Sequence, residues 1–201
     1  MTLLAMLRHG ETAWNLARRI QGRTDIPLSP EGRTRIRACS LPEAFTGWRT
    51  ACSPLARCKE TAGLLGLHDV EVEPRLTEMS WGNWEGRTLD ELRSEFAGEM
   101  RANEDLGLDF APPGGESPRQ VFTRVSDWLA ETARRGESTL AVSHKGVIRA
   151  VFAVAMGWDM RGRPPVRMNW SALQVFNLDA HGVPGPYRLN VALNVSEGAR
   201  H

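Results

Sequence analysis

Two pairs of residues in this chain have the chemistry that a phosphate group requires. Arg8 and His9 directly follow a short apolar run, 2–7, and Ser143 and His144 follow a second apolar run late in the chain. An imidazole can attack phosphorus without a metal, and a guanidinium offers a planar fork of donors that matches phosphate oxygens. Arg-His-Gly alone is a weak signal, because so short a motif occurs by chance in unrelated chains.

A third segment strengthens the pattern. Ser53, Pro54 and Arg57 follow the predicted strand 49–52. In an α/β sheet the carboxyl ends of the parallel strands meet at one edge, where ligands bind. Three strand ends therefore bring two arginines and two histidines to one edge of the predicted sheet. A single histidine would more often be a hydrogen-bonded or exposed structural residue.

The elements that position these residues alternate between strand and helix along the chain. Ser29 before Pro30, and Ser117 before Pro118, are typical of a helix N-cap followed by proline in the first turn. We predict an α/β fold, a three-layer α/β/α single domain with a mostly parallel central sheet. The predicted strands are 2–7, 49–52, 70–72, 139–142, 172–178 and 187–193, and the predicted helices are 29–43, 53–65, one from about 88, 117–135 and 147–156.

Two irregular segments interrupt this alternation. The segment 76–86 is rich in Trp and Gly, and 110–117 is too rich in Pro and Gly for helix or strand, so we expect the latter to form a lid or a rim. No repeat or low-complexity linker divides the chain. We expect one domain over 1–195 and a disordered tail over 196–201.

Composition limits the classes of partner. The chain has 201 residues and a formal net charge of +1, which favours neither nucleic acid nor a membrane surface. It shows no leader pattern and no apolar run of membrane-spanning length. Its three cysteines, Cys39, Cys52 and Cys58, have no Cys-x-x-Cys spacing, which suits a reducing compartment. We expect a cytoplasmic protein whose partner is a small-molecule phosphate ester. Whether the protein forms a homodimer is left open by the sequence.

Other phosphate-processing chemistries lack their residues. A cysteine phosphatase loop needs Cys-x5-Arg, but the required positions after Cys39 and Cys52 hold Phe45 and Cys58. Neither lysine lies in a nucleotide-binding phosphate loop, and no Asp-x-Asp pair follows a strand. The sequence has no HExxH pattern, so we expect no metal and no cofactor.

Six ordered blocks of sequence resemble the histidine phosphatase superfamily, which has the phosphoglycerate mutase-like fold. The resemblance extends over almost the whole chain, and six blocks in the same order are a specific signal. The blocks are LRHGETAWN at 7–15, QGRTDIPLSPEG at 21–32, SPLARCKETA at 53–62, LTEMSWGNWEG at 76–86, PPGGES at 112–117 and SHKG at 143–146.

The resemblance implies a catalytic role for five residues. His9 is the nucleophile that becomes phosphohistidine, Glu78 is the proton donor, and Arg8, Arg57 and His144 hold the phosphoryl oxygens. Two arginines and a protonated His144 supply positive charge where the transition state develops negative charge.

Two of these roles set physical requirements. His9 must attack as a neutral imidazole, so we expect its other ring nitrogen to donate to a backbone carbonyl near Gly10. Glu78 must be protonated to act as an acid. Apolar neighbours would raise its pKa and the arginines would lower it, which leaves the direction open.

The resemblance also places further residues around the phosphate. We expect binding by Thr12, Asn15, Gln21, Gly22 and Thr24, although Asn15 facing water and Thr24 in a local turn are equally good readings. Other positions have two readings each. Glu116 and Ser117 close over the site, or Ser117 only caps the following helix. Glu85 is more consistent with a structural role. Lys145 points either into the mouth of the site or outward.

We expect a metal-independent phosphomonoesterase. The compact chain, with MSWGNWEG after Glu78 and PPGGES, is similar to the small phosphatases of the family, foremost the alpha-ribazole phosphatases and next the broad-specificity ones. Alpha-ribazole 5′-phosphate is thus the leading substrate, and Trp81, Trp84 and Phe110 either stack on its base or only pack. The alternatives are a cofactor-dependent phosphoglycerate mutase and a non-catalytic member that binds phosphoesters.

Overall fold

The computed structural model describes residues 1–196, apart from the side chains of 99–101. The expected tail lies outside the described residues, except for Ser196. Six strands form a mixed, mostly parallel sheet in the order β4-β3-β5-β1-β6-β7. The strands are β1 (Thr2–Arg8), β3 (Arg49–Cys52), β4 (Glu71–Val72), β5 (Thr139–Ser143), β6 (Leu173–Leu178) and β7 (Pro184–Val191).

The register of the sheet places the expected site residues side by side. β1 and β5 pair in parallel with Arg8 opposite Ser143, and the His9 amide donates to the Ser143 carbonyl at 3.0 Å. β5 also pairs in parallel with β3, with Val142 opposite Cys52. The segments that follow these three strands therefore emerge at one edge of the sheet.

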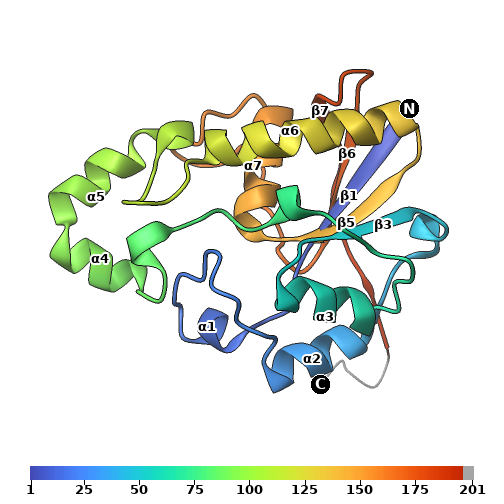
Figure 1. The fold of residues 1–201 in the computed structure, drawn as a ribbon, viewed down its shortest axis with the longest axis horizontal. Coiled ribbons are helices and arrows are strands. Elements are labelled where there is room, and N and C mark those ends of the chain that lie inside the picture. The colour runs from blue at the N-terminus through green and yellow to red at the C-terminus, as the bar shows by residue number, and fades with distance from the viewer. Residues whose placement is uncertain (197–201) are drawn as a thin grey trace.

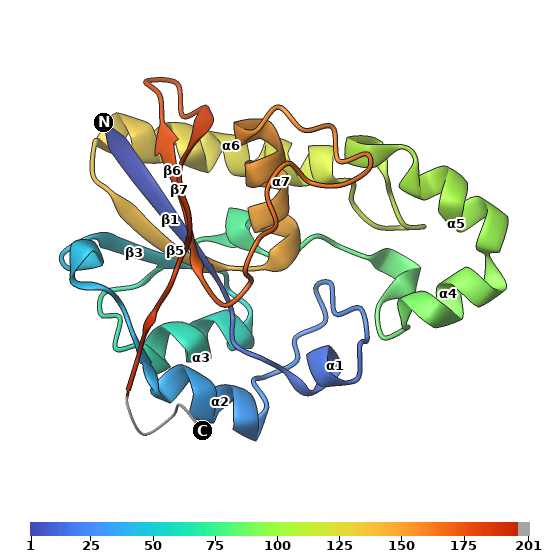
Figure 2. The ribbon, with the colours of Figure 1, turned by 180° about the vertical axis from the view of Figure 1, so that it is seen from behind.

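Helices cover both faces of the sheet, which confirms the three-layer architecture (Figures 1 and 2). One face carries α2 (Pro30–Arg37) and α3 (Ala56–Leu64). The other carries α6 (Pro118–Arg135) and α7 (Lys145–Ala155). Alternate side chains of β1 pack against the helices on the two opposite faces of the sheet. Leu4 and Met6 pack with α6 and α7, whereas Ala5 and Leu7 pack with Cys58 and Ala62 of α3.

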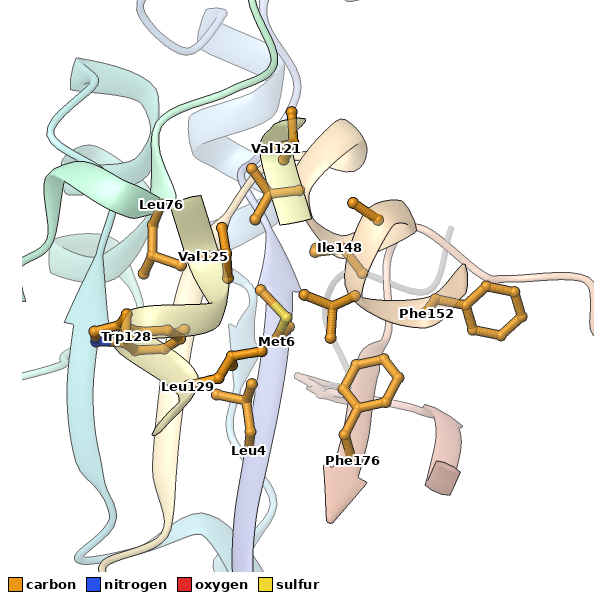
Figure 3. Close-up of a cluster of buried hydrophobic side chains, with 14 of the residues drawn as sticks. Leu4, Met6, Leu76, Val121, Val125, Trp128, Leu129, Ile148, Phe152 and Phe176 are labelled. Carbon is orange, nitrogen blue, oxygen red and sulfur yellow. The ribbon is translucent and has the colours of Figure 1, made fainter. Parts of the chain in front are cut away.

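The larger core lies between β1 and the α6–α7 layer (Figure 3). Val125, Trp128 and Leu129 of α6 meet Leu4 and Met6 there, and all five are at most 2% exposed. The apolar side chains of α6 recur every three or four residues, which produces one continuous face toward the sheet.

The predicted caps of α2 and α6 are present. Helix α3 begins at Ala56, with Leu55 as its N-cap and no side-chain cap, so the expected start of this helix at Ser53 and Pro54 is wrong. Ser29 Oγ accepts from the Gly32 amide at 2.9 Å, and Ser117 forms a capping box with Gln120. Helix α2 ends at Arg37, so its expected extension to 43 is wrong. The chain there turns into β2 (Cys39–Ser40), which pairs with β8 (Asn194–Val195), and Pro42 opens a short 3-10 turn, η1 (Glu43–Phe45).

Smaller elements surround the sheet edge that carries the site. They were not predicted individually, except for a helix near 88. This helix is α4, and it is followed directly by α5; the two helices project away from the sheet (Figure 1). These elements are α1 (Ala13–Leu16), α4 (Leu89–Glu95), α5 (Ala97–Glu104) and the 3-10 turns η2 (Pro74–Leu76), η3 (Gly82–Trp84) and η4 (Gly107–Asp109).

Within residues 1–196, none of the helices combines the length and the apolar character that crossing a bilayer requires.

Because the apolar face of α6 is buried against the sheet, truncating one of its side chains should greatly lower the free energy of unfolding. Leu129→Ala should lower the free energy of unfolding by about 2–5 kcal/mol, because Leu129 is fully buried. Leu106→Ala is the matched control, since Leu106 is 47% exposed, and it should change stability by about 0.5 kcal/mol or less. Chemical denaturation of the two variants checks this. Equal losses would contradict the assignment of α6 to the core.

Candidate active site

Four of the five expected catalytic residues line one cleft. Arg8 ends β1 and His9 follows it, Arg57 lies in the first turn of α3, and Glu78 lies between η2 and η3. The cleft has a volume of about 720 Å³. His144 is fully buried behind it, with its ring centroid 5.2 Å from that of His9. The fold thus brings all five residues together. The strand ends predicted this for Arg8, His9, Arg57 and His144, and the family resemblance implied it for Glu78.

His9 is held as a neutral imidazole. Its Nδ1 lies 2.7 Å from the Gly10 carbonyl, and because a carbonyl can only accept, Nδ1 carries the proton. This confirms the expected hydrogen bond. Burial, followed by the positive charges of Arg8 and Arg57, keeps the pKa of His9 well below its ordinary value. The Nε2 lone pair is therefore free to act as a nucleophile.

His144 is also neutral. Its Nδ1 accepts from Arg57 Nε at 3.3 Å, and its Nε2 lies 2.7 Å from Ser53 Oγ. Burial, followed by His9 and Arg57, keeps the pKa of His144 well below its ordinary value. The expectation of a protonated His144 is therefore wrong for this structure, because burial disfavours a charged ring and because Nδ1 accepts from Arg57. His144 lies against Arg57 and helps to position it.

Arg57 connects the strand-end cluster to the loop that follows α1. The guanidinium is fully buried, and it donates to the Gly22 carbonyl at 2.7 Å and to the Thr24 carbonyl at 2.9 Å. Burial lowers the pKa of Arg57, and the negative charge of Glu78 opposes this. Arg57 therefore shapes the cleft wall and supplies positive charge to it.

Arg8 has a buried donor with no protein partner. Among the described residues, none forms a hydrogen bond with its Nε. Burial lowers the pKa of Arg8, and Glu78 opposes this. Leaving a buried charged donor unpaired costs free energy, which an anion in the cleft would offset.

Glu78 is the buried carboxyl of the cluster, 8% exposed. Its Oε1 accepts from the amides of Met79 at 2.8 Å and Gly146 at 3.0 Å. Burial raises the pKa of Glu78 and outweighs the lowering by these bonds and by the arginines. This settles the direction that the sequence left open. A Cβ at position 146 would lie 2.4 Å from Oε1, so only glycine fits beside the carboxyl.

The expected phosphate-binding residues divide into two groups. Asn15, Gln21 and Gly22 line the cleft, as expected. Thr12 and Thr24 do not, so their expected role as direct ligands is corrected. The Thr12 hydroxyl is fully buried, caps α1 and donates to Gln21 Oε1 at 2.9 Å. These two threonines position the residues that line the cleft.

Glu85 holds the loop that carries Gly22. It accepts from the amides of Arg23 and Thr24, both at 2.9 Å, and from the Thr24 hydroxyl at 2.5 Å. Burial alone would raise the pKa of Glu85, but these hydrogen bonds together lower it. Gly22 has a φ of +54°, and a Cβ there would meet Glu85 Oε1 at 2.0 Å. The structural reading of Glu85 is thus confirmed.

Arg124 is a positioning residue that sequence reasoning missed. It reaches across from α6 and donates to the carbonyls of Thr77 at 2.6 Å and Glu78 at 3.2 Å. Glu116 accepts from Arg124 Nε at 3.1 Å and from the Ser80 amide at 2.9 Å. No sequence pattern indicated this, because the three segments meet only in the fold. Glu116 therefore anchors the segment after Glu78, and Ser117 caps α6.

The aromatic residues mainly pack against one another. The rings of Trp81 and Phe110 lie edge to face at 5.6 Å and line the cleft, whereas Trp84 is buried behind them. The cleft also has a basic lining that the sequence did not single out, apart from Lys145. These residues are Arg18, Arg19, Arg93, Lys145 and Arg149.

In the part of the chain that the structure describes, no group of three or more His, Cys, Asp or Glu side chains is arranged to hold a metal ion.

The chain is similar in sequence and in fold to proteins that are named as phosphoglycerate mutases and phosphatases. A probable phosphoglycerate mutase of Enterobacter sp. (strain 638) is 32% identical over 163 residues, which cover 78% of this chain and 76% of the relative. The mycobacterial glucosyl-3-phosphoglycerate phosphatase, solved with inorganic phosphate, superposes with a TM-score of 0.77 at 26% identity, covering 96% of this chain and 98% of that one.

Two further solved structures are similarly close. The alpha-ribazole phosphatase of Shigella flexneri has a TM-score of 0.76 at 25% identity, covering 98% of this chain and 100% of that one. The phosphoserine phosphatase of Entamoeba histolytica, in complex with 3-phosphoglyceric acid, has a TM-score of 0.78 at 26% identity, covering 96% and 98%. The profile of the histidine phosphatase superfamily (branch 1) matches residues 4–184. This chain therefore belongs to the histidine phosphatase superfamily, as a phosphoric monoester hydrolase.

Proposed function

We propose that the chain hydrolyses small phosphate monoesters through a phosphohistidine on His9 Nε2, without a metal ion. One observation carries the proposal. The Nδ1–H of His9 is committed to the Gly10 carbonyl at 2.7 Å, so Nε2 is the free nitrogen of a histidine that shares its cleft with two arginines and Glu78. These are the parts that phosphoryl transfer to nitrogen requires.

In the first step the His9 Nε2 lone pair forms a bond to phosphorus, and the bond from phosphorus to the ester oxygen breaks. The proton of the Glu78 carboxyl goes to the departing oxygen, so the product leaves as an alcohol. Arg8 and Arg57 stabilise the negative charge on the phosphoryl oxygens. The hydrogen bond to Gly10 stabilises the positive charge that the ring of His9 acquires.

In the second step a water molecule attacks the phosphorus. The Glu78 carboxylate, deprotonated by the first step, accepts the proton of this water. The bond between phosphorus and nitrogen breaks, its electron pair returns to Nε2, and inorganic phosphate leaves. His9 and Glu78 are then back in their starting states.

Alpha-ribazole 5′-phosphate is one candidate substrate. Trp81 and Phe110 form an apolar wall on which an aromatic base can stack, and the Shigella flexneri structure supports this candidate. Glycerate phosphates are another, supported by the basic lining and by the mycobacterial and Enterobacter proteins.

Phosphoglycerate mutase activity is the second candidate function, since the Enterobacter relative carries that name. Both reactions use the same phosphohistidine, but in a mutase the substrate hydroxyl takes the place of water. Incubation with 3-phosphoglycerate separates them. Release of inorganic phosphate supports the phosphatase, whereas isomerisation without release would replace it with the mutase.

His9→Ala should abolish turnover, because His9 is the only histidine of residues 1–196 that lines the cleft. Rapid acid-free quenching of the wild-type protein with a 32P-labelled substrate should trap labelled protein, and His9→Ala should trap none. His68→Ala is the control, since His68 is exposed and is not one of the residues that line the cleft. Unchanged steady-state hydrolysis in His9→Ala would contradict the phosphohistidine mechanism.

Glu78→Gln should slow hydrolysis of an alkyl phosphate about 10²–10⁴-fold, because the alkoxide then leaves without a proton. The loss on p-nitrophenyl phosphate should be much smaller, since nitrophenolate needs no protonation to leave. The two kcat/KM values of each protein check this. Equal losses on both substrates would show that Glu78 does not act as the acid.

The same residue predicts a pH dependence. Because burial raises the pKa of Glu78, the protonated acid persists above its ordinary range, and kcat/KM on an alkyl phosphate falls as pH rises through that raised pKa. Glu78→Gln should lose this falling limb. A limb that persists in the variant, or one that follows the second ionisation of the substrate phosphate, would contradict the assignment.

A further inference from the structure

Two cations lie on the α7 wall of the cleft that contains His9. Lys145 and Arg149 are four residues apart on α7, so they share one face of the helix, and both line the cleft. Lys145 Nζ lies 5.3 Å from the ring centroid of Trp170, and Arg149 Cζ lies 5.2 Å from that of Trp158. The aromatic rings fix both cations but leave their N–H donors available.

Neither Lys145 nor Arg149 has an acidic partner among the described side chains. Within residues 1–196, leaving aside the side chains of 99–101, no carboxylate forms an ion pair with Lys145 or Arg149. Two other cations of the cleft lining have partners. Arg93 pairs with Glu104 at 2.9 Å, and Arg19 donates to the Gly86 carbonyl, whereas Arg18, like the two α7 cations, has no ion pair among the described residues.

The positive charges of the α7 wall and the catalytic cluster act on each other. Lys145 is exposed inside the concave cleft, where the surrounding protein lowers its pKa, and the charges of Arg8 and Arg149 lower it further. Burial also lowers the pKa of Arg149. An anion bound here would relieve this repulsion and would gain charge-assisted hydrogen bonds.

We propose that Lys145 and Arg149 bind a second anionic group of the substrate, a carboxylate or a second phosphate, while Arg8 and Arg57 hold the phosphoryl group that His9 attacks. The proposal rests on the proposed function and narrows its substrate class to acidic phosphate monoesters. It also places alpha-ribazole 5′-phosphate, which has no second anionic group, below the acidic substrates.

Matched substrates isolate this subsite. 3-Phosphoglycerate and glycerol 3-phosphate differ in a carboxylate, and fructose 1,6-bisphosphate and fructose 6-phosphate differ in a second phosphate. The ratio of kcat/KM between the acidic and the less acidic member should exceed one in wild type for at least one pair, and that pair identifies the anion. Lys145→Met and Arg149→Met should each lower that ratio about tenfold to a hundredfold.

Lys59→Met is the matched control, because it removes an exposed cation that does not line the cleft, and its ratio should equal that of wild type. Arg149→Lys keeps the charge and should retain most of the preference, and it replaces Arg149→Met if that variant fails to fold. A wild-type ratio of one or less for both pairs, unchanged ratios in Lys145→Met and Arg149→Met, or faster turnover of alpha-ribazole 5′-phosphate would overturn the proposal.

A binding measurement distinguishes a failure of the proposed anion subsite from a failure of the proposed function. Calorimetric titration of His9→Ala with 3-phosphoglycerate and glycerol 3-phosphate, and with the fructose pair, measures the subsite without turnover. Tighter binding of the acidic member, lost on adding Lys145→Met, supports the subsite even if the wild type releases no phosphate. Equal binding within both pairs would overturn it even if the wild type is an active phosphatase.

Discussion

The hydrogen bond from His9 Nδ1 to the Gly10 carbonyl is the interaction on which the site depends. It fixes which ring nitrogen carries the proton and therefore which one faces the cleft with a lone pair. The bond exists because β1 ends at Arg8, which is paired with Ser143, the last residue of β5. The chain therefore turns immediately after the pairing of the two strands ends. The sheet register thus determines the chemistry of one imidazole.

Burial gives the surrounding charges their effect. It lowers the pKa values of His9 and His144 and raises that of Glu78, so the free site holds two neutral histidines beside two arginines. In water the same groups would be screened and hydrated, and neither shift would be large. Phosphoryl transfer then needs little rearrangement, because the positive charge is in place before the substrate arrives.

The sequence predicted the residues that lie at strand ends better than those that join distant segments. His9, Arg57 and His144 each come after a strand, and the alternation of elements places such positions at one edge of the sheet. Arg124 and Glu116 had no such signal, since their partners come from segments that only the folded chain brings together. Helix α2 was predicted too long because its pattern shows nothing of the β2–β8 pairing. The charge of His144 was misjudged for a similar reason, since it depends on burial and on the neighbouring Arg57.

The protonation state of His9 tests the central claim most directly. Nitrogen NMR of protein labelled in the histidine rings, with the His9 signals identified by their loss in His9→Gln, reports tautomer and charge as pH is lowered. The account predicts a neutral ring protonated at Nδ1, which stays neutral through the ordinary histidine pKa of about 6.5. A proton on Nε2, or protonation of the ring at or above that value, would contradict it.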